Sequence, residues 1–382
     1  MALLKKILRK VQFLIKLQGM ANVPGEDIAE DTVVLVRLDA IGDFIMSYGV
    51  FCEYRNFYRG KKIILICSAS CEPLARAWNI ADEVIAINME KYRLEREYIK
   101  SRNSILTNIS AGIVIQMVIR RSVEMEYIVG LIHSNNKIAL SRDAGEGNWR
   151  RRWDKIYSRI VKYDRHGDFE IKKFFYLANS IMDTDITPHQ SVLPRTECRY
   201  IPEKPYFVIA QGGSFPAKKW ENEKYVSVGN YILEKRKIKC YLLGANGDKE
   251  DNDFIYRGIL YQERVVNLTG ETSILDSIEI IRDAEFVITN DTCFVHIAAA
   301  VNTKCICIAG GWHWGRFVPY DLQATAEIYN FPLTVYHKMD CFECDFRSSE
   351  CARLKESSTE KKLPCISGIA VEDMIQAVSK CW

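Results

Sequence analysis

Short apolar runs rich in Val and Ile recur along the chain, and most are followed by a polar turn and a segment of helical composition. Such runs are typical of strands buried on both faces of a parallel sheet. They lie at 32–38, 63–67, 83–87, 113–118 and 137–140 in the first half, and at 206–210, 238–243, 286–288 and 304–309 in the second. The alternation predicts an α/β fold with mostly parallel, doubly wound sheets.

A stretch containing several prolines, 187–205, interrupts this alternation, and strands and helices then start afresh. A chain of 382 residues is long enough to bury two cores. We therefore predict two Rossmann-like domains that face a central cleft. The predicted limits are 1–24 for a basic helix, 25–195 and 196–340 for the two domains, and 341–382 for a cysteine-rich segment with a closing helix.

The stretch 286–300 carries the clearest chemical signal. An apolar run ends in a polar turn, and an Ala-rich segment that suits a helix then begins. Asp291 or Thr292 can cap this helix, and its first N–H groups favour an anion such as phosphate. His296 follows about one turn later, near enough to face the same ligand. The alternative, an ordinary strand-to-helix connection with a packed histidine, stays open.

Two further loops of the second half fit a nucleotide. The loop after the strand at 206–210 contains two glycines and then Ser214, Lys218 and Lys219, and such a loop can cradle phosphates. After the next strand, Asp248 or Glu250 lies where an acid can bind ribose hydroxyls. Glycine loops are common, so these signals count only in combination.

Asp43 is the candidate of the first half. It follows the strand at 32–38 across a short loop and lies where a helix at 44–58 is expected to begin. Open α/β sheets bind their ligands outside the carboxyl ends of strands. A carboxylate at this point either acts on a ligand or caps the helix.

The charge and the cysteine content restrict the class of protein. A net charge of +3 is too small to indicate binding to nucleic acid. No apolar run has the length of a membrane span, and basic residues interrupt any secretory signal near the N-terminus. We expect a cytoplasmic protein whose thirteen cysteines form no disulfide framework.

Two segments are strongly basic. Residues 1–20 combine a helical spacing of apolar residues with five Lys or Arg and no acid, which favours a helix on an anionic membrane surface over one that packs on the core. Arg150, Arg151 and Arg152 lie between two tryptophans, and they either bind an anionic, sugar-like acceptor or form a solvated loop.

Cys341, Cys344, Cys351 and Cys365 follow the last expected strand at close spacing. Four thiolates can bind Zn or Fe tetrahedrally, so a structural metal site is predicted here. Free thiols or a disulfide are the alternatives.

Taken together, the motifs resemble glycosyltransferase family 9, which contains the ADP-heptose:lipopolysaccharide heptosyltransferases. The sequence Arg-Leu-Asp-Ala-Ile-Gly-Asp at 37–43 is similar to the family's N-terminal signature. The C-terminal motifs are similar to Gly213-Ser214 with Lys218-Lys219-Trp220, Leu268-Thr269-Gly270, Asn290-Asp291-Thr292 with 296–300, and Pro319-Tyr320. They occur in the family's order, from about Val33 to the C-terminus.

The resemblance implies a GT-B fold with an N-terminal acceptor domain and a C-terminal domain for a nucleoside-diphosphate sugar, most often ADP-heptose. It implies an inverting transfer to a lipopolysaccharide-type or lipid-linked glycan at the inner face of the cytoplasmic membrane, with no cofactor required for catalysis. Asp43 matches the general base, and Thr269 and Gly270 are expected near the nucleotide base. The donor-binding residues that it implies are Ser214, Lys218, Lys219, Asp248, Glu250, Thr269, Gly270, Asp291, Thr292, Cys293 and His296.

The chain departs from the family pattern at Cys293 and Phe294, in the bulky aromatic loop 312–314, and at Glu221, where proline is usual. These departures leave the donor sugar open. Two other functions compete with transfer: a sugar-nucleotide epimerase of GT-B-like fold, and a catalytically silent protein that binds nucleotide-sugars.

Overall fold

The computed structural model describes residues 13, 28–142, 153–165, 167–322, 329–344, 351 and 361–381. The chain divides into two compact units. The first comprises Met1–His166 and Lys172–Thr187, and the second comprises Gly167–Ile171 and Pro188–Trp382. The chain therefore enters the second unit for five residues, returns to the first, and crosses again after Thr187.

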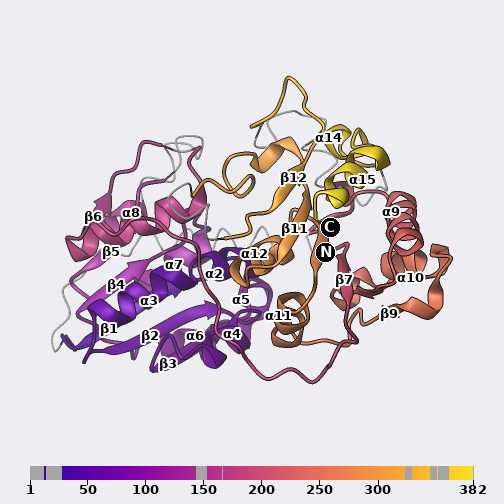
Figure 1. The fold of residues 1–382 in the computed structure, drawn as a ribbon. Coiled ribbons are helices and arrows are strands. Elements are labelled where there is room, and N and C mark those ends of the chain that lie inside the picture. The colour runs from indigo at the N-terminus through magenta and orange to yellow at the C-terminus, as the bar shows by residue number, and fades with distance from the viewer. Residues whose placement is uncertain are drawn as a thin grey trace. The chain divides into compact units, whose positions relative to one another are not determined.

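The first unit is built on a parallel sheet with the strand order β3-β2-β1-β4-β5-β6 (Figure 1). Its central strand is buried over its whole length and pairs with β2 on one side and β4 on the other. Burial on both faces explains why its sequence is continuously apolar rather than alternating. The strands are β1 (Thr32–Arg37), β2 (Lys62–Ser68), β3 (Glu83–Ile87), β4 (Ile113–Gln116), β5 (Lys137–Leu140) and β6 (Arg159–Val161).

The helices of this unit follow the strands in the order expected for a doubly wound sheet. They are α2 (Ile41–Met46), α3 (Tyr48–Phe57), α4 (Glu72–Ala77), α5 (Met89–Leu94), α6 (Arg96–Leu106), α7 (Val123–Leu131) and α8 (Glu170–Met182). The single helix predicted at 44–58 begins earlier and is divided at Ser47, whose hydroxyl donates to the Asp43 carbonyl (2.8 Å). A serine that bonds back to residue i−4 often bends a helix.

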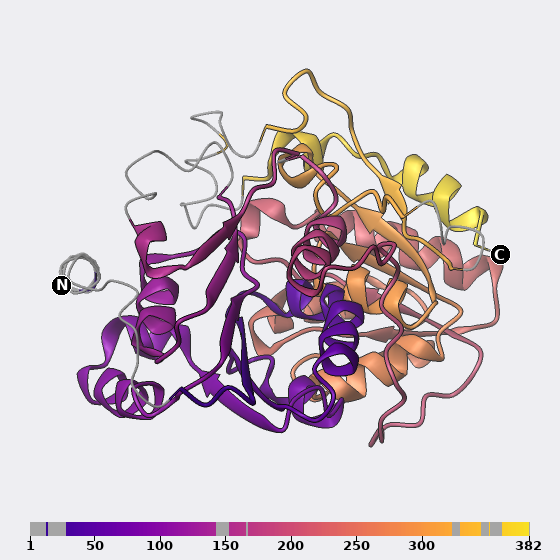
Figure 2. The ribbon, with the colours of Figure 1, turned by 90° about the vertical axis from the view of Figure 1, so that its left-hand side faces the viewer.

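The second unit repeats the plan with the order β12-β11-β10-β7-β8-β9. Figure 2 shows the strands and helices of its later part in orange and yellow. Numbered from the first strand of each sheet, both orders are 3-2-1-4-5-6, which is that of a Rossmann fold. The predicted α/β class with two Rossmann-like units is confirmed. The strands are β7 (Tyr206–Ala210), β8 (Lys239–Leu242), β9 (Val265–Asn267), β10 (Phe286–Asn290), β11 (Lys304–Ile308) and β12 (Leu333–Val335).

Helices and short 3-10 turns complete the second unit. The closing helix predicted at 369–380 corresponds to α15, and the Trp220 indole N–H donates to the carbonyl of Ile369 just before it (3.1 Å). The helices are α9 (Asn222–Lys235), α10 (Lys249–Gly258), α11 (Ile274–Arg282), α12 (Cys293–Ala300), α14 (Pro364–Ser367) and α15 (Val371–Ser379), and the turns are η2 (Pro216–Lys218), η3 (Asn246–Asp248), η4 (Gln262–Arg264) and η5 (Gly311–His313).

The segment Gly167–Ile171 packs as part of the second unit although it lies early in the chain. The Arg316 guanidinium forms a two-pronged ion pair with the Glu170 carboxylate (2.9 and 3.0 Å), and the rings of Phe169 and Tyr320 lie 4.8 Å apart. Arg–carboxylate pairs of this geometry are the stronger class of charged hydrogen bonds.

Phe13 is the one described residue within the segment 1–20. Its ring is 4% exposed and lies against Tyr92 and Tyr127 in the core of the first unit, with centroids 5.6 and 5.2 Å apart. This contact favours the core-packing interpretation at this position. In the described stretches, no helix combines the length and apolar character needed to cross a bilayer.

Candidate functional site

In both sheets the strand order reverses at the first strand, between β1 and β4 in one unit and between β7 and β10 in the other. Open α/β sheets bind their ligands at this point, outside the carboxyl ends of the strands. A ligand site is therefore expected in the loops that follow these four strands.

Asn290, the last residue of β10, joins two of these loops. Its side-chain oxygen accepts hydrogen bonds from the Trp220 N–H (3.2 Å) and the Tyr225 hydroxyl (3.1 Å), and its nitrogen donates to the Gly212 carbonyl (2.9 Å). All of these groups are buried. Asn290 thus fixes the loop that carries Lys218, a role that its place in the sequence motif did not reveal.

Asp291 is the charged centre of the second unit. Its carboxylate lies 3.5 Å from the Lys218 Nζ and 3.7 Å from the His313 Nδ1, and its side chain is 6% exposed. Burial opposes ionisation of this carboxyl, but Lys218, His313 and His296 outweigh that effect and hold its pKa well below the usual range. Asp291 is therefore a buried carboxylate, and His313 is a neighbour that the sequence analysis had noted only as part of an aromatic loop.

The helix α12 begins directly after Asp291. Thr292 is its N-cap, with the side-chain oxygen accepting from the Phe294 N–H (3.3 Å), so of the two predicted caps the structure uses Thr292. The first N–H groups of a helix have no partner within the helix and can bind an anion. Cys293 follows the cap, and burial, with a contribution from Asp248, raises the pKa of its thiol to about 12.

His296 lies one turn inside α12 and is 4% exposed. Its Nδ1 is 2.8 Å from the Tyr320 hydroxyl. Burial lowers the pKa of His296 to about 4, with Asp291 acting in the opposite direction. The histidine is therefore neutral at pH 7.

Lys219 has different partners from Lys218. Its Nζ donates to the carboxylates of Asp248 and Asp251, at 2.8 Å each. Burial opposes its charge, yet the two carboxylates raise its pKa. Lys219 is thus held by two acids, whereas Lys218 faces Asp291.

The other residues predicted to bind the donor differ in how far they are exposed to solvent. Ser214 and Glu250 are exposed, on the loop after β7 and in the first turn of α10. Thr269 is buried, and its hydroxyl is bonded to Asn252 and Asn267 (2.7 and 2.6 Å).

Gly270 follows with φ +78°, and an added Cβ would lie 2.1 Å from the Asn246 side-chain oxygen. Only glycine fits this conformation and this close approach.

In the first unit, Asp43 is the third residue of α2 rather than its N-cap, which is Ala40, so the capping interpretation is wrong. The Arg37 side chain lies next to Asp43 and is 1% exposed to solvent. The guanidinium donates to the Asp43 carbonyl (3.2 Å), lies 3.7 Å from the Asp43 carboxylate, and pairs with Asp39 (3.1 Å). The Phe174 ring lies 4.2 Å from its central carbon. Arg37 was part of the recognised motif, but its contact with Asp43 was not foreseen.

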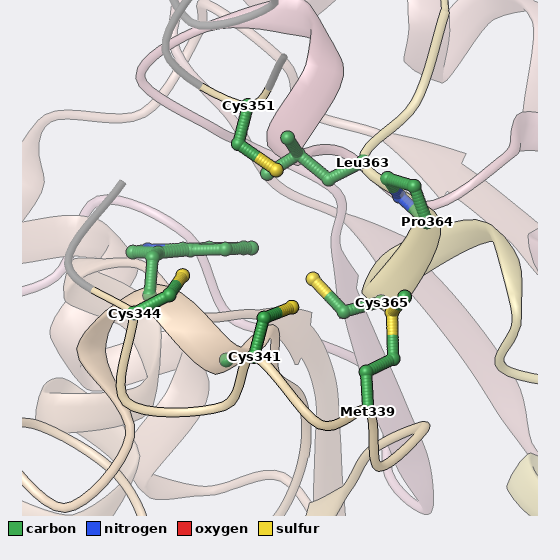
Figure 3. A pocket seen from close by; sticks show the side chains of 9 residues that line it. Met339, Cys341, Cys344, Cys351, Leu363, Pro364 and Cys365 are labelled. Atoms are coloured by element: carbon green, nitrogen blue, oxygen red, sulfur yellow. The ribbon is translucent and has the colours of Figure 1, made fainter. Parts of the chain in front are cut away.

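The four cysteines predicted as metal ligands line one small cavity of about 30 Å³, and their sulfurs turn toward it (Figure 3). We refer to it as the cysteine pocket. In the described part of the chain, no group of three or more Cys, His, Asp or Glu side chains is placed so that it could hold a metal ion. All thirteen cysteines of the chain are without disulfide bonds. The pocket is lined by Gly311, Trp312, Met339, Cys341, Cys344, Cys351, Leu363, Pro364 and Cys365.

Two sets of predicted residues lie outside the part of the chain that the structure describes. Arg150, Arg151 and Arg152 lie outside the described residues, and so do the basic residues of the segment 1–20. Their proposed roles stay predictions.

Comparison with known proteins adds a second line of observation. Residues 150–343 match glycosyltransferase family 9 (heptosyltransferase). Lipooligosaccharide heptosyltransferase 2 of Haemophilus ducreyi is 23% identical over 288 residues, which cover 71% of this chain and 80% of that protein. The structure of Escherichia coli ADP-heptose lipopolysaccharide heptosyltransferase II has a TM-score of 0.66 at 16% identity, over 92% of this chain and 98% of its own.

A further solved structure contains a metal. The iron-containing dodecameric TibC from enterotoxigenic Escherichia coli, in complex with ADP-D-β-D-heptose, has a TM-score of 0.53 at 12% identity, over 94% of this chain and 78% of its own. At these identities the structural likenesses establish the fold that the chains share.

Proposed function

The chain belongs to glycosyltransferase family 9, and we propose that it transfers a heptose from ADP-heptose to a lipopolysaccharide-type glycan. The observation that carries this proposal is the grouping of Lys218, Asp291 and the N-terminus of α12 at the switch point of the second sheet. A lysine beside a helix N-terminus suits the diphosphate of a nucleoside-diphosphate sugar. When the sugar is transferred, the nucleoside diphosphate is the leaving group.

In this proposal the second unit binds the donor. The Lys218 ammonium and the N–H groups of Thr292 and Cys293 take the diphosphate and stabilise the negative charge that grows on it as the sugar leaves. When the Tyr320 hydroxyl donates to Nδ1 of His296, the proton of this neutral ring resides on Nε2, which can then donate to a phosphate oxygen.

The first unit would bind the acceptor and supply the base. Asp43 accepts the proton of the acceptor hydroxyl while that oxygen forms a bond to the anomeric carbon and the bond from this carbon to the phosphate oxygen breaks. One displacement of this kind inverts the anomeric centre. Arg37 holds the Asp43 backbone and lies beside its carboxylate, so it acts as a positioning residue.

The direct test is incubation of the purified chain with ADP-heptose, with and without a lipooligosaccharide acceptor that lacks the heptose. We expect heptosylated product and an equal amount of ADP only when both substrates are present. A change in the sugar nucleotide without acceptor would instead identify an epimerase, and binding of ADP-heptose with no product under any condition would identify a silent binding protein. A thermal-shift comparison of ADP-, GDP-, UDP- and CDP-sugars tests the choice of base.

We also propose that the cysteine pocket binds one Zn or Fe ion. Four soft sulfur donors around a cavity with apolar walls suit either metal, and the two are not separated by the donor set. An ion would draw the sulfurs inward and hold together segments that are distant in sequence. Elemental analysis of tag-free protein should give about one Zn or Fe per chain, and protein with less than a tenth of that would refute the site.

A peripheral association with the inner face of the cytoplasmic membrane is the remaining proposal. It rests on the charge and apolar spacing of residues 1–20, since a basic amphipathic helix binds anionic lipid. The burial of Phe13 limits the apolar surface that this segment can offer to lipid, so the charged residues would carry most of the affinity.

A further inference from the structure

The cysteine pocket and the ion pair of Lys218 with Asp291 both contact one turn of chain, η5. Gly311 and Trp312 line the pocket, and Trp312 and His313 face Lys218 and Asp291. Both sites lie in the second unit, so this relationship depends only on residues within one compact body.

On the pocket side, Gly311 is held by the segments that bear the cysteines. Its carbonyl accepts from the Glu343 N–H (2.8 Å), one residue before Cys344. Gly311 and Cys365 also lie together in the lining of the pocket. An added Cβ at Gly311 would lie 2.8 Å from the Phe342 ring, so the two segments are in close contact.

On the other side of η5, Trp312 and His313 contact the ion pair of Lys218 with Asp291. The Trp312 ring centre lies 5.4 Å from the Lys218 Nζ, and the His313 Nδ1 lies 3.7 Å from the Asp291 carboxylate. A cation over an indole face is attracted by it, so the placement of the ring influences the placement of the ammonium.

Building on the proposed metal and donor sites, we propose that a metal ion in the cysteine pocket fixes the position of η5. Through η5, the ion would hold Lys218 and Asp291 in the positions that bind the donor diphosphate. The pocket is lined by residues of 339–344, 351 and 363–365. An ion bonded to their sulfurs would tie these segments together and so fix Gly311, whose carbonyl accepts from the Glu343 N–H. The four cysteines are then positioning residues for donor binding, through Gly311 and Trp312.

The test measures ADP and adenosine binding by calorimetry on the full chain as purified, after chelation, and after reloading with Zn²⁺ or, without oxygen, Fe²⁺. Metal content is measured on each sample. We expect chelation to weaken ADP binding about tenfold and reloading to restore it, as changes around a metal site commonly produce effects of this size. Adenosine binding should change less than about twofold, because η5 touches groups that act on the phosphates.

Variants separate a positioning role from a general loss of structure. Cys341→Ser should lose metal and bind ADP like the chelated protein. The matched control is Cys198→Ser in the same unit, where a hydroxyl can still donate to the Asp276 carbonyl (3.7 Å from the sulfur), and it should keep both metal and ADP affinity. Trp312→Leu should keep its metal but no longer change its ADP affinity on chelation.

The outcomes distinguish the inference from the proposals on which it rests. Metal that binds without altering ADP affinity would overturn the positioning role and leave both sites standing. Absence of metal from every sample would remove the metal site and the inference with it, whereas ADP binding would still support the donor site. Failure of the metal-loaded chain to bind ADP would refute the proposed donor site itself.

Discussion

The Lys218 ammonium lies 3.5 Å from the Asp291 carboxylate, and both side chains are buried in loops that follow neighbouring strands of one sheet. Neither group is stable alone in such a place, because removing one partner leaves an unpaired buried charge. The pair therefore holds Lys218 at the switch point of the second sheet.

Replacing this lysine tests the donor site. Lys218→Ala should weaken ADP binding by more than about tenfold and adenosine binding hardly at all, because the ammonium acts on the charge of the diphosphate. Calorimetry with the two ligands measures the difference. Equal losses for ADP and adenosine would place the phosphates elsewhere.

Lys219→Ala serves as the matched control. Its loss leaves the carboxylates of Asp248 and Asp251 without their shared cation, so we expect a lower Tm as the main effect. If this variant instead loses ADP affinity selectively while Lys218→Ala does not, the assignment of the two lysines must be exchanged.

The proposed base is tested by Asp43→Asn. An amide keeps the shape of the side chain but cannot take a proton, so turnover should fall by about 100-fold or more while the affinity for ADP stays the same. Asp39→Asn is the control, because it also removes a carboxylate paired with Arg37. Near-normal turnover in Asp43→Asn, or an equal loss in both variants, would exclude Asp43 as the base.

The buried histidine predicts how stability depends on pH. The pKa of His296 is lowered from 6.5 to about 4, so between these values the unfolded chain binds more protons than the folded one. Stability is therefore fully present above pH 6.5 and falls as the pH decreases toward 4, by at most about 3 kcal/mol from this residue.

Thermal melts between pH 4.5 and 7.5 measure this effect. His296→Gln should show a flatter decrease of Tm toward low pH than the parent chain, whereas His133→Gln, at an exposed position of the first unit, should follow the parent. Parallel slopes in all three proteins would show that His296 does not titrate in this window.

The N-terminal segment can be tested by separating its charge from its apolar contact. Replacing Lys5, Lys6, Arg9, Lys10 and Lys16 by glutamine should reduce binding to anionic vesicles, because these charges attract anionic lipid, and we expect Tm to stay the same. Phe13→Ala should lower Tm by removing a ring from the core. If the intact chain ignores anionic vesicles, the membrane proposal fails.

Sequence reasoning placed the central strands well because they are buried on both faces and read as continuous apolar runs. The edge strands β6, β9 and β12 were missed, since each is three residues long and only partly buried. The division of the helix at Ser47 was also missed. It depends on one hydroxyl bonding to a carbonyl, which helix periodicity does not encode.

The candidate site was predicted to a similar degree. Motif positions indicated Lys218 and Asp291, but not that His313 would approach Asp291 from a loop beyond the next strand. The neutral state of His296 depends on burial, which residue type alone does not reveal. Asp251 lies in the first turn of α10 and belongs to no recognised motif, yet it shares Lys219 with Asp248.

The short segment Gly167–Ile171 limits how the two units of this protein can be separated. A protease that cuts only between Thr187 and Pro188 leaves Glu170 on the first fragment, although its partner Arg316 belongs to the second. The two pieces would remain noncovalently associated after cleavage and would separate only under denaturing conditions. A truncated gene meant to yield the second unit alone should therefore begin before Gly167 rather than at the proline-containing linker.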